Sequence, residues 1–139
     1  MKYMAFDIGD KRIGIAVSDP FCEMALPLET YYRKNFKKDI EYLTKLAKDR
    51  YVDVIVCGLP VNFDGSRSIQ TEKTESFIEE LKKNTDIKIV TEDERFTTLE
   101  ARRILIEADV KRQDRKAVID KVAASYILET YMLKQKNKV

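Results

Sequence analysis

Residues 2–18 read KYMAFDIGDKRIGIAVS, in which two short apolar runs flank the polar link GDKR. The runs at 2–7 and 13–18 predict the two strands of a hairpin. A third extended segment, MALPLET at 24–30, contains Pro27, which favours an edge or irregular strand. The chain therefore begins with a predicted meander of three strands.

The middle of the chain alternates between helical and extended patterns. Residues 36–50 carry apolar side chains at spacings of three and four, which predicts an amphipathic helix. Residues 52–58, VDVIVCG, are β-branched and nearly all apolar, as is typical of a strand buried on both faces in a parallel sheet. A second helix is predicted at 68–83. The side chains that this helix is expected to bury are Ile69, Phe77, Ile78 and Leu81.

One more strand and two more helices complete the predicted order. The strand is predicted at 87–92 and the helices at 98–108 and 114–134, ahead of a polar tail at about 134–139. Over residues 1–139 the order of elements is βββαβαβαα. A meander followed by alternating helices and strands predicts a single α/β domain, in which helices flank a five-stranded mixed sheet.

The composition excludes several kinds of catalytic chemistry. The chain contains no histidine, which removes nucleophiles activated by a Ser–His or Cys–His pair. Cys22 and Cys57 are isolated in the sequence, which argues against a zinc site or a disulfide framework. Carboxylates are then the strongest candidate metal ligands, and oxygen ligands favour Mg²⁺ or Mn²⁺.

Net charge identifies no partner, because the chain has nearly equal numbers of basic and acidic side chains, 26 and 24. Basic residues do gather at 11–12, 33–38, 102–103 and 111–116, where they could together contact phosphates, although solvated surface explains each cluster alone. No run of about 20 apolar residues is present to span a membrane, and Asp7 interrupts any signal peptide. We therefore expect a cytoplasmic protein.

Two groups of acids stand at predicted strand ends. Asp7 closes the first strand, and Gly9 behind it would allow the backbone a tight turn or a close approach to a ligand. Asp93, Glu94 and Arg95 directly follow the last strand, where at least one acid could face the same rim. Hydrogen bonds within a turn, ion pairing with the arginine, or stabilisation of the next helix explain these acids about equally well.

Asp120 belongs to the apolar stripe of the last helix, which Ala124, Ile127 and Tyr131 continue at offsets of 4, 7 and 11. A carboxylate on a packed face is costly unless something compensates its charge, and a shared divalent cation would do so. The adjacent alanines at 123–124 would let this helix approach the sheet closely. The alternative is a role at the helix start, or an ion pair with a neighbouring lysine.

Four segments together resemble a known family. They are DIGDKRIGIAVSD at 7–19, GLPVNFDG at 58–65, TEDERFTTLEAR at 91–102 and DKVAASYILETYM at 120–132. In this order and spacing they are similar to the YqgF/RuvX family of Holliday junction resolvases, also described as pre-16S rRNA nucleases. The resemblance covers essentially the whole chain and implies a ribonuclease H-like (RNase H-like) fold, similar to the order of elements predicted above.

The resemblance also implies a site. The acidic positions of the family correspond to Asp7, Glu94 and Asp120, which we expect to be catalytic and to bind one or two Mg²⁺ or Mn²⁺ ions. The residues expected to contact substrate are Lys11, Arg12, Asn62, Arg95 and Thr98. Asp93 stays open as a supporting ligand or a bystander, and Asp10 replaces the small hydroxyl residue that relatives often carry.

The function implied is metal-dependent endonucleolytic cleavage of phosphodiester bonds, with the 5′ end of pre-16S rRNA as the expected substrate and ribosomal particles as further candidate partners. Branched DNA is the alternative substrate. A non-catalytic nucleic-acid-binding factor is another class, and so is an ATP-binding lobe related to actin and sugar kinases. The last is disfavoured because those proteins bind nucleotide between two lobes. No pattern in the sequence predicts an oligomeric state.

Overall fold

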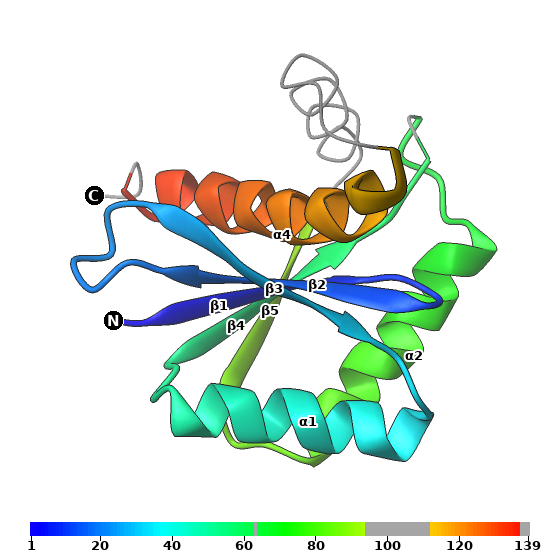
Figure 1. The fold of residues 1–139 in the computed structure, drawn as a ribbon, viewed down its shortest axis with the longest axis horizontal. Coiled ribbons are helices and arrows are strands. Elements are labelled where there is room, and N and C mark those ends of the chain that lie inside the picture. Colours follow the sequence, from blue (N-terminus) through cyan, green and yellow to red (C-terminus); the bar gives the residue numbers. More distant parts are fainter. Residues whose placement is uncertain (63, 94–111, 137–139) are drawn as a thin grey trace.

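The computed structural model describes residues 1–62, 64–93 and 112–136 and shows a sheet between two layers of helices (Figure 1). The strands are β1 (Tyr3–Ile8), β2 (Arg12–Ser18), β3 (Ala25–Tyr32), β4 (Val54–Leu59) and β5 (Lys88–Asp93). The helices are α1 (Phe36–Asp49), α2 (Ile69–Lys83) and α4 (Arg112–Lys136). Each was predicted to within a few residues, while the helix predicted at 98–108 lies outside the described residues. None of these three helices could cross a membrane.

The five strands form one mixed sheet in the order β3-β2-β1-β4-β5. β1, β4 and β5 run parallel, whereas β2 pairs antiparallel with both β1 and β3. The strand that contains Pro27 is at the edge, as predicted, since proline lacks the N–H that a central strand needs. The prediction of a five-stranded mixed sheet flanked by helices is confirmed.

Alternation along β1 divides the core between the two faces of the sheet. Met4, Phe6 and Ile8 pack on the face that α1 and α2 cover. Ala5 packs on the opposite face, together with the buried stripe of α4. β4 is buried on both faces, as its β-branched sequence predicted. Asp7, between two residues of the first face, therefore belongs to the face covered by α4.

One predicted core residue is wrong. Ile69 is 75% exposed, whereas Thr71 and Thr74 are buried on the inner side of α2. Ser68 caps the helix through the amide of Thr71, and the Thr71 hydroxyl donates to the carbonyl of Pro60. Because successive residues turn by about 100° around a helix, Ile69 lies about 200° from Thr71 and faces solvent. Hydrogen bonding by threonine, not apolar character, decides which side of this first turn faces the protein.

Candidate active site

Helix α4 lies against β2 at Gly14. A Cβ atom placed on Gly14 would lie 1.8 Å from the carbonyl oxygen of Asp120, so only glycine allows this approach. Farther along the helix, Ala123 and Ala124 are fully buried, as expected for a helix that packs closely on a sheet. The contact brings the backbone of Asp120 onto the middle of a strand.

Asp7 lies beside the same contact. Asp7 and Gly14 are register partners on β1 and β2. Partners in an antiparallel pair project from the same face, with Cβ positions about 4.5–5.5 Å apart. Since the Cβ direction of Gly14 points at Asp120, the side chain of Asp7 also projects toward the part of α4 that contains Asp120. The structure thus brings together two of the three predicted acids, which are far apart in the sequence.

Arg12 forms an ion pair with the second of these acids. Its Nε lies 2.6 Å from Oδ2 of Asp120, and both side chains are mostly buried, with 27% and 21% of their surface exposed. Burial raises the pKa of the Asp120 carboxyl, and the hydrogen bond and charge of Arg12 offset this only in part. Burial therefore disfavours the charged form of the Asp120 carboxyl more than Arg12 favours it. Additional positive charge beside this carboxyl would be favourable.

The third predicted acid, Glu94, lies outside the described residues, as do Arg95 and Thr98. β5 ends at Asp93, at the same edge of the sheet as the end of β1, because both strands run parallel to β4. One residue that the sequence did not single out is Glu92. It is 7% exposed and pairs with Lys134 of α4, so it belongs to the face that also carries Asp7.

The other predicted contacts to substrate are near this edge or in a turn. Lys11 is exposed in the link between β1 and β2. Asn62 is exposed, and its side-chain amide donates to Oγ of Ser66 at 2.8 Å, within a turn that Asp64 and Gly65 complete. For Asn62 the structure therefore describes a role in the turn, and contact with substrate stays a prediction.

The donor set is suited to a hard divalent cation. Asp7 and Asp120 offer carboxylate oxygens, which Mg²⁺ and Mn²⁺ prefer. Among the described ranges no group of three acidic or cysteine side chains is arranged to hold a metal ion, and the third predicted ligand is outside them. Asp7 and Asp120 fit a divalent cation because both offer carboxylate oxygens and because burial raises the pKa of Asp120. We expect Glu94 to supply a further ligand.

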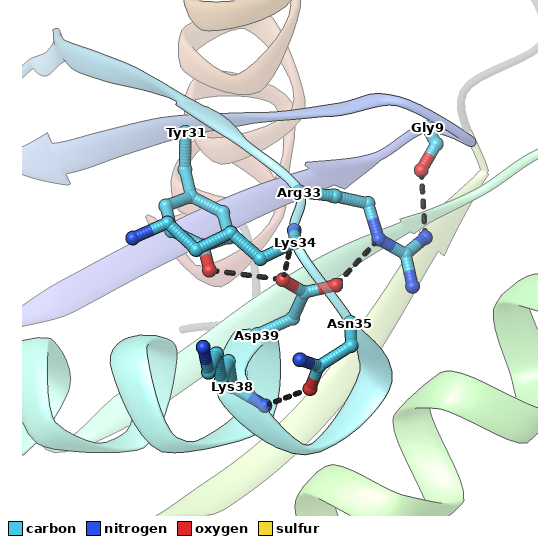
Figure 2. Close-up of polar contacts among 7 residues, drawn as sticks. All are labelled: Gly9, Tyr31, Arg33, Lys34, Asn35, Lys38 and Asp39. Carbon is cyan, nitrogen blue, oxygen red and sulfur yellow. Dashed lines mark hydrogen bonds and ion pairs between the residues drawn. The ribbon is translucent and has the colours of Figure 1, made fainter.

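A second arginine–aspartate pair supports the turn behind Asp7 (Figure 2). The carboxylate of Asp39, 1% exposed in the first turn of α1, accepts from Nε of Arg33 at 2.9 Å. It also accepts from the Tyr31 hydroxyl and the backbone N–H of Lys34, each at 2.9 Å. Nη1 of Arg33 in turn donates to the carbonyl of Gly9 at 2.8 Å. A buried acid is thereby connected to the turn that follows β1.

These hydrogen bonds determine the charge of Asp39. Burial by itself would raise the pKa of Asp39, but donation from Lys34, Arg33 and Tyr31 outweighs it, and the pKa lies below its usual value. Burial and the bond to Asp39 raise the pKa of Tyr31 to about 12. No pattern in the sequence predicted this network. Its only signal was an acid next to the apolar stripe of the helix at 36–50.

The sequence matches the family described as "RuvX: Holliday junction resolvase" over residues 1–134. A relative from Clostridium acetobutylicum, named "Putative pre-16S rRNA nuclease", is 45% identical over 132 residues, which cover 95% of this chain and 98% of the relative. A relative of the same name from Thermoanaerobacter pseudethanolicus is 45% identical over 139 residues, covering 99% of this chain and all of the relative.

Solved structures show the same fold at low sequence identity. RuvC of T. thermophilus in complex with a Holliday junction substrate has a TM-score of 0.63 at 8% identity, covering 100% of this chain and 98% of RuvC. The fowlpox virus resolvase bound to Holliday junction DNA has a TM-score of 0.56 at 17% identity, covering 97% and 99%. The predicted RNase H-like fold is confirmed.

Proposed function

Because the chain belongs to the RuvX Holliday junction resolvase family, and is thus a nuclease that hydrolyses phosphodiester bonds, we propose that it cleaves precursor 16S rRNA with Asp7, Glu94 and Asp120. The observation that carries the proposal is the register of β1 and β2, which pairs Asp7 with the glycine that contacts Asp120. Acids that are distant in sequence and close in space are typical of metal-dependent nucleases.

The roles of the residues follow from their charges and contacts. Asp7 and Asp120, with Glu94, would hold one or two Mg²⁺ or Mn²⁺ ions. Such ions, when bound, make a water molecule a better nucleophile and stabilise the leaving oxygen. Arg12 orients the carboxyl of Asp120 and keeps part of its charge, because its guanidinium is within hydrogen-bonding distance. Without histidine in the chain, no imidazole competes for the role of base.

Recognition of substrate would depend mainly on phosphates. Lys11 is exposed beside the end of β1, and Arg95 and Thr98 occupy matching positions of the family motif. Contacts of this kind give affinity that falls with added salt and that carries little base specificity. Asn62 would add a polar contact from the turn at 62–66.

The names of the relatives favour precursor 16S rRNA as substrate. We propose that the chain cleaves it at its 5′ end. The description of the family supports a second candidate, a branched DNA junction. Cleavage of both substrates should be measured side by side under the same conditions. We expect faster cleavage of the precursor rRNA, and preferential cleavage of the junction would favour the second candidate.

The sharpest test of the site is Asp7→Asn. Cleavage should fall by on the order of 100-fold or more, because a neutral amide is a poor ligand for a hard cation. Binding of nucleic acid and the thermal unfolding midpoint should stay close to wild type. Chelation with EDTA should abolish wild-type cleavage, and addition of Mg²⁺ or Mn²⁺ should restore it.

Asp49→Asn provides the matched control, since Asp49 is an exposed acid paired with Lys45 on α1. This variant should cleave at the wild-type rate. Cleavage that persists in Asp7→Asn would remove Asp7 from the catalytic set, and cleavage that persists in EDTA would contradict the metal-dependent mechanism.

A further inference from the structure

A cavity of about 600 Å³ opens between the amino-terminal ends of α1 and α2, next to the turn between β1 and β2. We propose that this cavity binds an unpaired nucleotide of the substrate, with the base against Phe36 and the adjoining phosphates near Lys11, Lys34 and Lys73. The inference rests on the proposed nuclease function and deepens it, because it names a single-stranded segment as the feature recognised beside the cleavage site.

The cavity is close to the candidate active site but on the other face of the sheet. Ile8, Phe36 and Phe77 line it, and two of these belong to the core between the sheet and α1 and α2. Asp10 and Lys11 also line it, and they belong to the link that directly follows β1. A nucleic-acid strand that crosses this link would pass from Asp7 on one face of the sheet into the cavity on the other face.

The charge around the cavity is complementary to phosphate. Of its described lining side chains, Lys11, Arg33, Lys34 and Lys73 are cationic, and only Asp10 and Asp39 are acidic. Asp39 is already neutralised by Arg33. Asp10 is 3.9 Å from Nζ of Lys73, but both side chains are about 60% exposed, so water screens this pair. Three exposed lysines therefore remain available to a phosphate backbone.

An exposed aromatic ring stands among these cations. Phe36 is 47% exposed and lines the cavity. Its position is held by an edge-to-face contact with buried Phe77, with ring centroids 5.5 Å apart, while Arg33 lies over the Phe77 ring at 4.9 Å. Basic side chains around an aromatic platform are the combination that binds single strands, because any base can stack on the ring.

The wall of the cavity also holds a polar group without a partner. Thr74 is 1% exposed and lines the cavity, and its hydroxyl has no hydrogen-bond partner in the described part of the chain. Buried hydroxyls are normally satisfied, so this one is an exception that needs a cause. An unstacked base could enter the cavity and lie against this wall, whereas a base inside a duplex could not reach into the cavity.

The test is fluorescence anisotropy in EDTA with a labelled 12-nucleotide single-stranded RNA, the same sequence as DNA, and the blunt duplex. Phe36→Leu should weaken binding of both single strands by roughly fivefold or more, since stacking contributes about 1–3 kcal/mol per base. Binding of the duplex should stay unchanged, and Phe36→Tyr should restore single-strand affinity. A preference for RNA over DNA would show contact with the 2′-hydroxyl.

Matched controls are available for both kinds of residue. Phe21→Leu removes another exposed phenylalanine, 81% exposed, from the loop between β2 and β3 at the opposite end of the sheet (Figure 1). Lys73→Gln should reduce the slope of log affinity against log salt by roughly 0.7. Lys82→Gln, at the other end of α2, should leave that slope unchanged. Thermal unfolding of Phe36→Leu separates lost binding from lost folding.

The outcomes separate this proposal from the nuclease itself. Single-strand affinity that is equal in wild type and folded Phe36→Leu overturns the nucleotide site, whatever the cleavage assay shows. Binding that depends on Phe36 in a protein that cleaves neither substrate supports the site and overturns the proposed function. A loss of duplex and single-strand affinity together would contradict the selective contact with an unpaired base.

Discussion

Two arginine–aspartate pairs lie on opposite faces of the sheet, near the same edge, and they differ in how well the acid is compensated. Asp39 accepts three hydrogen bonds from the described residues around it, and its pKa lies below the usual value because these bonds outweigh the cost of burial. Asp120 accepts from Arg12, and burial still raises its pKa.

The difference distinguishes an acid that stabilises the fold from an acid that is suited to bind a cation. A satisfied carboxylate stabilises the fold and has little to gain from a cation. A desolvated and under-compensated carboxylate destabilises the fold, and a bound cation would offset that cost. The contrast can be tested by removing each acid and by changing the glycine that positions one of them.

The largest effect on stability is expected for Asp39→Asn. The free energy of unfolding at neutral pH should fall by about 3–5 kcal/mol, because the change leaves the mostly buried guanidinium of Arg33 without its charge partner. Since the folded pKa of Asp39 is below its unfolded value, its contribution is present above about pH 4 and is lost as pH falls through the folded pKa. Urea unfolding from pH 3 to pH 7 measures both effects. A variant as stable as wild type at pH 7 would contradict a structural role.

Gly14→Ala should have the next largest effect. The added methyl group would collide with the backbone of Asp120, so α4 must move away from β2. The free energy of unfolding should be about 1–3 kcal/mol lower than in wild type, as for other overpacked cores. Cleavage should fall more than this loss of stability explains, because the shift separates Asp120 from Asp7. Wild-type cleavage in Gly14→Ala would show that the distance between these two acids is not critical.

The smallest effect, opposite in sign, is expected for Asp120→Asn. Its free energy of unfolding at pH 7 should be about 0.5–1 kcal/mol higher than that of wild type, while cleavage is lost. The folded pKa of Asp120 is above its unfolded value, so wild type loses stability as pH rises through that pKa, and the variant does not. The difference should therefore grow from about pH 4 until the pH exceeds the folded pKa, and stay constant above it.

Asp49→Asn on the surface of α1 is the control for this stability comparison and should change the free energy of unfolding by less than about 0.5 kcal/mol. Destabilisation of Asp120→Asn as large as that of Asp39→Asn would show that the two acids have the same structural role.

Local patterns in the sequence were enough to predict most of the fold. Apolar spacing predicted α1 and α4, and β-branched runs predicted β4, because these periodicities follow from the geometry of one element at a time. The same reasoning placed Asp120 on a packed helix face and the Pro27 strand at the sheet edge. It was wrong for Ile69, where the hydrogen bonds of Thr71 set the orientation of the helix.

Only the tertiary structure determined which side chains lie close together. Asp7 lies near Asp120 because of a register between β1 and β2 and a glycine that admits α4, and register depends on pairing between segments. Arg33, in a cluster that the sequence presented as surface charge, reaches both Asp39 and Gly9. The sequence by itself determined the elements and the kinds of side chain, because these follow from local periodicity and composition. Packing of distant segments determined which acid has its charge compensated by the protein and which acid is suited to bind a ligand.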